Sequence, residues 1–308
     1  MPYPADGRTL AAGVVARGSL PARWGQAGGD AYSAAVRYLR SRDDAPFEPG
    51  REVGDGPGVE VAPVVHLETV SVQRIRLAAG AGEAIHAHEV DCYLVVLAGT
   101  VEVAVERGSG AGDAVVTPAP EGTVVFVPAG TGHGVRKSGP GDGDGPAEVL
   151  ELFVPGLRPG HPVRTAGAGT AGAADAPSGA WFSTRVDREA FTVGARAGGF
   201  AVQTLADASS GAPGCVLNAA RVEAGGAGPA VHVHRFDQLF VVLEGELHVD
   251  VALDRVVARA LDVVVLPAGV PHTQWNEGDG TEIHLAVLVP PPGPGEPVTV
   301  PVTFGRVG

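Results

Sequence analysis

The sequence contains an internal repeat, and this repeat constrains the fold more than any other feature. The segment GAGEAIHAHEVDCYLVVLAG at 80–99 corresponds to GAGPAVHVHRFDQLFVVLEG at 226–245. A second pair follows in the same order, FVPAGTGH at 126–133 and VLPAGVPH at 265–272. Two separate matches in the same order indicate duplication of a whole domain. The 308 residues are enough for two domains of ordinary size.

Composition favours an all-β chain. Hydrophobic residues make up 44% of the sequence and aromatic residues only 5%, while Gly and Pro occur 46 and 26 times. Short apolar runs between Gly and Pro are typical of strands joined by tight turns. We predict strands at 70–77, 93–97, 100–105 and 124–127 in the first half, and at 215–222, 239–243, 246–251, 263–266 and 283–289 in the second.

These patterns predict four regions along the chain. Residues 1–58 form an extension with a short helix, which Asp30 caps and in which Tyr32, Ala35, Val36 and Leu39 share one face. Residues 59–155 form the first β domain and residues 181–308 the second. Residues 156–180 are rich in Gly, Ala and Pro, as expected for a linker.

Charge and cysteine content argue against several classes of partner. The formal net charge is −13, which disfavours nucleic acid and anionic membranes. No apolar stretch approaches the roughly 18 residues that a membrane span requires. Cys92 and Cys215 follow no paired spacing, so we expect no disulfide framework. We therefore expect a cytoplasmic protein that acts on a small molecule.

Histidines recur at the same places in both repeats. His86 and His88 are one residue apart and His133 follows a Pro-Ala-Gly turn; the second half repeats this with His232, His234 and His272. Alternation along a strand places each His-x-His pair on one face, together with Cys92 in the first half and Gln238 in the second. Three imidazoles suit Fe, Mn, Ni, Co, Cu or Zn and leave coordination positions open.

These segments resemble the two signature motifs of the cupin superfamily, G-x5-H-x-H-x3,4-E-x6-G and G-x5-P-x-G-x2-H-x3-N. In the second motif, Lys137 replaces the closing Asn of the first copy, and Leu261 replaces the opening Gly of the second copy, which keeps Asn276. The resemblance implies two jelly-roll-like barrels in tandem, that is, a bicupin. Its ligands would be His86, His88 and His133 in the first barrel and His232, His234 and His272 in the second.

The family's glutamate is absent from both copies of the first motif. Cys92 occupies its place in the first copy, where it could bind metal as a thiolate or serve as a small apolar residue. Gln238 occupies it in the second, where its oxygen could bind metal directly or hydrogen-bond a metal-bound water. We expect direct ligation by Gln238 and count Cys92 among the candidate ligands.

The lysine, the other histidines and the aromatic residues near the motifs are expected to have structural roles or to line a pocket. Lys137 could steer an anionic substrate, although a solvated lysine is the simpler interpretation. We expect the four histidines outside the motifs to be satisfied polar residues rather than ligands. Aromatic residues flank the second site in sequence and could line a pocket there. These histidines are His66, His161, His248 and His284, and the aromatic residues are Trp181, Phe182, Phe236, Phe240 and Trp275.

The resemblance implies a metal-dependent enzyme, and three functions follow from it. The first is an Fe(II)-dependent oxygenase of the dioxygenase type that acts on a small activated carbonyl, enol or aromatic substrate. The second is a non-redox isomerase, lyase or cyclase of secondary metabolism, because three-His, one-Gln sites resemble those of bicupin isomerases. The third is a non-catalytic ligand-binding bicupin. We predict that His232, His234, Gln238 and His272 are catalytic. The sequence leaves the oligomeric state open, although the resemblance implies a homodimer as one alternative, since cupins often dimerise.

Overall fold

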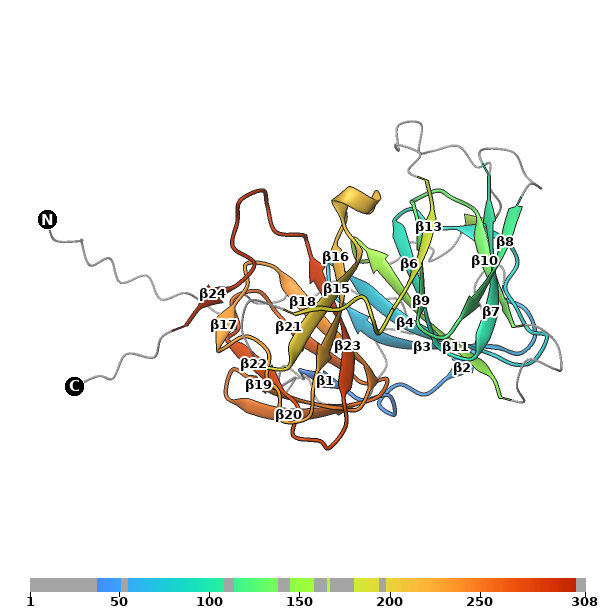
Figure 1. The fold of residues 1–308 in the computed structure, drawn as a ribbon. Coiled ribbons are helices and arrows are strands. Elements are labelled where there is room, and N and C mark those ends of the chain that lie inside the picture. Colours follow the sequence, from blue (N-terminus) through green and yellow to red (C-terminus); the bar gives the residue numbers. More distant parts are fainter. Residues whose placement is uncertain are drawn as a thin grey trace, which may run out of the picture.

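The computed structural model describes residues 38–50, 55–107, 114–137, 145–157, 165–166, 180–193 and 198–302. Two barrels lie side by side (Figure 1). Each barrel pairs one seven-stranded sheet with one five-stranded sheet. The described part of the chain is almost entirely β, with a single short 3-10 helix at Ala208–Ser210. This confirms the all-β fold.

The first barrel is built mainly from residues of the first half. Its seven-stranded sheet has the order β13-β9-β6-β11-β4-β3-β2 and its five-stranded sheet the order β12-β5-β10-β7-β8. The strands are β2 (Glu48–Pro49), β3 (Val59–His66), β4 (Ser71–Leu77), β5 (His86–Ala87), β6 (Asp91–Ala98), β7 (Thr100–Glu106), β8 (Ala114–Pro120), β9 (Thr123–Val127), β10 (His133–Lys137), β11 (Ala147–Val154), β12 (Thr165–Ala166) and β13 (Phe182–Arg185).

The second barrel repeats this arrangement. Its sheets have the orders β1-β21-β18-β23-β16-β15-β14 and β20-β19-β22-β17-β24. The strands are β1 (Leu39–Arg40), β14 (Thr192–Val193), β15 (Phe200–Ala206), β16 (Val216–Val222), β17 (His232–Val233), β18 (Asp237–Glu244), β19 (Glu246–Val251), β20 (Asp254–Arg259), β21 (Val263–Leu266), β22 (His272–Trp275), β23 (Glu282–Val289) and β24 (Val300–Pro301).

Glycines of the repeat occupy turns that require a left-handed backbone. Gly99 separates β6 from β7 with φ of 75°, and Gly245 separates β18 from β19 with φ of 79°. A side chain at such φ values is strained, which explains why both copies carry glycine there. Leu261 is informative because it stands where the first copy has Gly122. It keeps the left-handed conformation, with φ of 73° against 81° for Gly122, so the turn is retained without its glycine.

Apolar side chains form three cores, and one of them joins the barrels. One cluster fills the first barrel and another fills the second. The third cluster combines residues of both seven-stranded sheets, for example Tyr93 and Leu152 from the first barrel with Leu239 and Val287 from the second. Strands of these sheets are therefore buried on both faces, one toward a barrel interior and one toward the other barrel.

Short strands cross between the barrels. β1 pairs with β21 of the second barrel, although it precedes the first barrel in sequence. β13 pairs with β9 of the first barrel, although it follows the linker. Figure 1 shows β13 among the strands of the first barrel and β1 among those of the second. We propose 59–155 and 181–308 as domain boundaries, with these two strands exchanged.

This exchange corrects one expectation about the aromatic residues. Phe182 packs on Phe126 of the first barrel, with ring centroids 5.3 Å apart, and Trp181 packs against the core of the first barrel. Neither lines the second site. The predicted helix between Asp30 and Leu39 lies outside the described residues except at its end, where Leu39 belongs to β1. Both cysteines are buried. Among the described residues, no helix has the length and apolar character needed to cross a membrane.

Candidate metal centres

Strand pairing brings the three motif histidines of the first barrel together. His86 opens β5 and His133 opens β10, and these two residues face each other directly across an antiparallel pair. His88 follows β5 on the same side. The ring centroids of the three imidazoles lie 4.8–5.0 Å apart, and all three side chains are buried. The predicted cluster of His86, His88 and His133 therefore exists.

The second barrel reproduces this cluster. His232 on β17 faces His272 on β22 across the same kind of pair. The ring centroids of His232, His234 and His272 lie 4.4–4.9 Å apart. All three side chains are buried. The sequence repeat thus becomes a repeated site at the same end of each barrel.

Backbone carbonyls fix which ring nitrogen faces the cluster centre. Nδ1 of His86 lies 2.9 Å from the Ala84 carbonyl oxygen and Nδ1 of His133 lies 3.1 Å from that of Thr131. His232 and His272 use the carbonyls two residues before them in the same way, at 2.8 and 3.0 Å, and His234 uses that of Val298. Because a carbonyl only accepts, Nδ1 must donate, and the neutral ring then carries its lone pair on Nε2.

This tautomer leaves facing lone pairs in the second cluster. Nε2 of His232 lies 3.1 Å from Nε2 of His234, and Nε2 of His272 lies 3.1 Å from Oε1 of Gln238. The contact between His232 and His234 joins two acceptors, which repel each other unless a cation lies between them, whereas the amide of Gln238 can turn either its oxygen or its NH2 group toward His272. Histidines that bind a metal are held in the same way. Each ring is fixed by a hydrogen bond from its outer nitrogen, and the other nitrogens converge on the position of the metal. The residues present therefore fit a divalent transition metal.

Burial keeps the second cluster uncharged. Desolvation lowers the pKa of His232 and His234 below the ordinary value, and it lowers the pKa of His272 to about 3. Neighbouring histidines in the cluster lower the pKa of His232 and His272 further. Neutral imidazoles at neutral pH are the form that binds metal.

The structure adds a carboxylate to the first cluster that sequence reasoning missed. Glu151 of β11 is fully buried, and one of its oxygens lies within 4.8 Å of a ligand nitrogen of each of the three histidines. Nε2 of Gln73 on β4 donates a hydrogen bond to its Oε2. The motif glutamate is absent, as the sequence shows, but a glutamate from a different strand lies at the first cluster.

Cys92 does not share the position of Glu151. Its sulfur atom does not belong to the group of donor atoms that converge in the first barrel, which are those of His86, His88, His133 and Glu151. Instead it lies in the apolar core of the first barrel with residues such as Phe153. We therefore replace Cys92 by Glu151 as the proposed fourth donor. Gln238 keeps its proposed role, since its oxygen lies at the second cluster.

Aromatic side chains border both clusters. Phe153 meets His88 edge to face at 4.8 Å between centroids, and Phe236 stacks on His234 at 4.8 Å. Phe240 lies 6.4 Å from His272 between centroids. Trp275, in contrast, stacks on His248 and does not contact the second cluster's histidines. Two of the five aromatic residues expected near the second site, Phe236 and Phe240, are there.

Three of the remaining histidines each contact a polar side chain through one ring nitrogen. Nδ1 of His66 lies 2.9 Å from Oγ of Ser71, and His248 lies 3.6 Å from carboxylate oxygens of Glu246 and Glu277. His284 contacts the Glu282 carboxylate through Nδ1 at 2.9 Å. His161 lies outside the described residues.

Lys137 differs from its expectation. It is only 1% exposed, so the interpretation as a solvated lysine is wrong. It ends β10, four residues beyond His133, and its ammonium group lies beside Gly99. In the second barrel, Asn276 at the matching place donates to the carbonyls of Val222 and Gly280.

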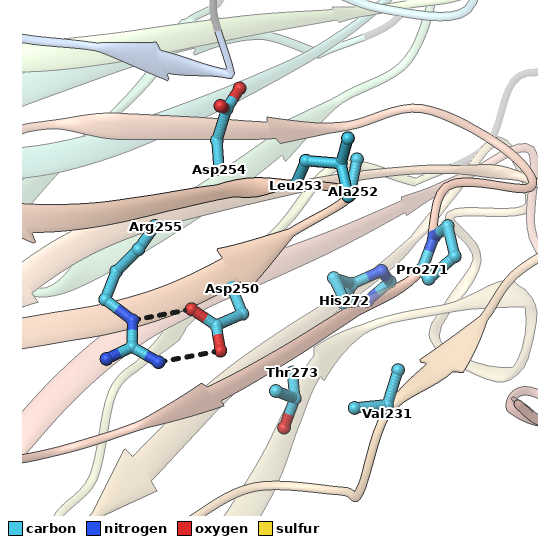
Figure 2. A pocket seen from close by; sticks show the side chains of 9 residues that line it. All are labelled: Val231, Asp250, Ala252, Leu253, Asp254, Arg255, Pro271, His272 and Thr273. Carbon is cyan, nitrogen blue, oxygen red and sulfur yellow. Dashed lines mark hydrogen bonds and ion pairs between the residues drawn. The ribbon is translucent and has the colours of Figure 1, made fainter. Parts of the chain in front are cut away.

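An open pocket of about 360 Å³ touches the second cluster from outside the barrel. Figure 2 shows its lining, in which Asp250 and Arg255 form two hydrogen bonds of 2.7 and 3.0 Å. Thr273 pairs with Asp250 and His272 with Val251, so alternation places Thr273 and Asp250 outside and the His272 ring inside with Val251. The pocket therefore lies on the outer surface, and we assign it no part in the chemistry.

Comparison with known proteins agrees with this fold. Residues 219–289 match the model of the cupin domain. No curated protein shows significant similarity to the sequence. The match lies within the second barrel, and the first barrel repeats its sheet arrangement and its histidine cluster.

Solved structures identify which bicupins it is similar to. Oxalate decarboxylase from Lactobacillus farciminis, in a formate complex, has 15% identity and a TM-score of 0.61, with 84% of this chain and 87% of that chain covered. Oxalate decarboxylase from Bacillus subtilis at pH 4.6 has 17% identity and a TM-score of 0.59, with 84% and 78% covered. A further structure of the Bacillus subtilis enzyme, described for its Mn(II) centres, has the same identity, TM-score and coverage.

Proposed function

We propose that this bicupin is a metal-dependent enzyme with one divalent transition-metal ion in each barrel. The observation that carries this proposal is the facing pair of acceptors in the second cluster, Nε2 of His232 and Nε2 of His234, 3.1 Å apart. The proposed ligands are His86, His88, His133 and Glu151 in the first barrel, and His232, His234, His272 and Gln238 in the second.

We propose lyase chemistry without net oxidation, specifically decarboxylation of a small carboxylic acid. The similarity to oxalate decarboxylases over 84% of this chain supports this reaction class. Decarboxylation breaks the bond between the carboxylate carbon and its neighbour, and the electron pair stays on the neighbouring carbon, which takes a proton from solvent. When bound, the ion would polarise an oxygen of the substrate. Mn(II) is the first ion to test, because one similar structure is described by its Mn(II) centres.

The residues around the second cluster have a defined task in this proposal. The backbone carbonyls of Ala230, Val270 and Val298 orient the three rings so that Nε2 faces the substrate side. Phe236 and Phe240 border the cluster and exclude water. An apolar surrounding favours loss of neutral carbon dioxide from a charged carboxylate, since it solvates the charge poorly.

One assay separates this function from the oxygenase expected from the sequence. The metal-free protein is loaded with Mn(II) or Fe(II), and a panel of small mono- and dicarboxylic acids, β-diketones and catechols is screened for carbon dioxide release and oxygen uptake. We expect carbon dioxide release without stoichiometric oxygen uptake. Oxygen uptake that matches substrate loss would instead establish the oxygenase. Bound metal with no turnover of any compound would leave a ligand-binding bicupin.

A further inference from the structure

The two centres differ at one position of matched strands. Glu151 on β11 pairs with Gln73 on one side and with Leu94 on the other. In the second barrel, the corresponding residue of β23 is Ala286, which pairs with Asn218 and Phe240. The barrels therefore share three histidines, but only the first has a carboxylate at this position.

This difference changes the charge that a bound divalent ion would keep. In the first centre, Glu151 cancels one of the two positive charges. In the second centre, the donors are His232, His234, His272 and Gln238, and none of them is a carboxylate. The ion would keep its full charge there, in a setting where an uncompensated charge is costly.

The surroundings of the second centre do not supply a substitute carboxylate. The only groups of three or more converging acidic, His or Cys donors among the described residues are the two clusters, and the second contains no acid. Glu282 lies inside the same barrel but engages His284 with both oxygens, at 2.9 and 3.0 Å from Nδ1. Gln238 is 8% exposed, whereas Glu151 is fully buried.

We infer that Glu151 makes the two centres unequal, so that the second centre completes its charge balance with a small carboxylate anion while the first does not need one. This rests on the proposed role of both clusters as metal centres. It assigns substrate binding to the second barrel and identifies residue 151 and its counterpart 286 as the positions that decide it. Metal and anion must then bind the second centre with mutual reinforcement, because each lowers the cost of burying the other's charge.

Single-centre proteins test this without any assay of turnover. His88→Ala leaves only the second centre and His234→Ala leaves only the first. Each protein is titrated with Mn(II) sulfate in carboxylate-free buffer, with and without formate as the probe anion, and free Mn(II) is followed by electron paramagnetic resonance. We expect formate to tighten Mn(II) binding to the second centre about tenfold, a typical coupling between two ligands. We expect no effect of formate on the first.

Removing the carboxylate from the first centre, or adding one to the second, should reverse the effect of formate on Mn(II) binding. Glu151→Gln in the protein with only the first centre keeps the size of the side chain and should create formate coupling. Ala286→Glu in the protein with only the second centre should abolish it. Equal coupling in both unmodified centres would overturn the inference, as would Mn(II) binding without coupling in Glu151→Gln. Failure of both centres to bind Mn(II) would overturn the proposed metal dependence as well, whereas coupling without any turnover would overturn only the decarboxylase proposal.

Discussion

The two barrels have the same scaffold and the same histidines but different residues on one interior strand. On the interior face of β11 the first barrel places Ala147, Val149, Glu151 and Phe153; on β23 the second barrel places Glu282, His284, Ala286 and Leu288. The histidines lie in short segments whose turns and strand pairing fix them. The long strand only has to present side chains of suitable size, so chemistry can diverge there without loss of the fold.

Each barrel has one fully buried glutamate on this strand, but at a different position: Glu151 on β11 and Glu282 on β23. The first barrel has an acid at the metal cluster, held by Gln73. The second has an acid at the other end of the strand, held by His284. Both acids are fully buried and hydrogen-bonded, as buried charges must be. The same scaffold therefore accommodates one interior carboxylate at either level, and only one of these levels reaches the histidine cluster.

The largest difference between the barrels should appear when each loses its metal. Two ions per chain are expected in the wild type, and His88→Ala and His234→Ala should each retain one. Turnover should fall only in His234→Ala, by more than the 10- to 100-fold that loss of an outer partner costs. Plasma mass spectrometry and the carbon dioxide assay measure the two effects. Equal loss of turnover in both variants would mean that the barrels do not divide binding and catalysis.

The buried pair of the second barrel should dominate its stability. Glu282→Ala leaves a buried imidazole without its partner and should destabilise the metal-free protein by about 3–5 kcal/mol, the range for breaking a buried pair. The double variant Glu282→Ala, His284→Val introduces the residues of the first barrel and should recover much of this loss. Urea unfolding monitored by circular dichroism gives both values. A double variant as unstable as the single one would show that the pair is not a self-contained unit.

The stability of the metal-free second barrel should depend on pH through His272. Its pKa is about 3 when folded against 6.5 when unfolded. Between these values the unfolded chain binds a proton that the folded chain does not, so the stability is full above pH 6.5 and falls as the pH decreases toward 3. The loss should be a few kcal/mol, at about 1.4 kcal/mol per pKa unit.

Two matched variants test whether His272 causes this pH dependence of stability. His272→Gln should flatten the stability profile between pH 6.5 and 4 in unfolding experiments with a chelator. His133→Gln removes the equivalent residue of the first barrel and reports its share. A profile that keeps its slope in His272→Gln would show that the desolvation of this imidazole is not what destabilises the acid form.

The support of the first carboxylate should have a smaller, local effect. Gln73→Leu removes the donor to Glu151 and should weaken Mn(II) binding to the first centre 10- to 100-fold, as outer partners of metal ligands do. The matched control is Asn218→Leu, at the corresponding position of the second barrel, which should leave Mn(II) affinity there unchanged. Calorimetric titration of the single-centre proteins measures both. Equal effects of the two variants would place Gln73 outside the metal centre.

The smallest effect concerns the turn where the barrels differ by Gly122 and Leu261. Gly122→Ala should cost about 1–2 kcal/mol, because the backbone there is left-handed, with φ of 81°, and nothing lies within 3.9 Å of the added carbon to cause a clash. Thermal unfolding checks this value. A neutral result would mean that the first barrel tolerates the strain as the second does with Leu261.

Much of the scaffold could be predicted from local sequence. Strands at Glu246–Val251 and Val263–Leu266 were predicted to the residue, because Gly, Asp and Pro end these short apolar runs. β11 was not predicted. It is buried on both faces, since one face fills the first barrel and the other packs against the second barrel. Such a strand shows no alternation of apolar and polar residues. Its two glutamates therefore interrupt the apolar run in the sequence, and nothing in the local pattern indicates that they are buried.

The sequence by itself determined the duplicated barrel and its six histidines, because repeats, turn glycines and alternating faces are properties of neighbouring residues. Only the tertiary structure decided that Glu151 lies at the first cluster, that Cys92 belongs to the core, and that strands β1 and β13 cross between barrels. These depend on contacts between segments far apart in the chain, such as Glu151 with His86. No local pattern encodes such distances, since they arise only when the sheets close and the barrels pack.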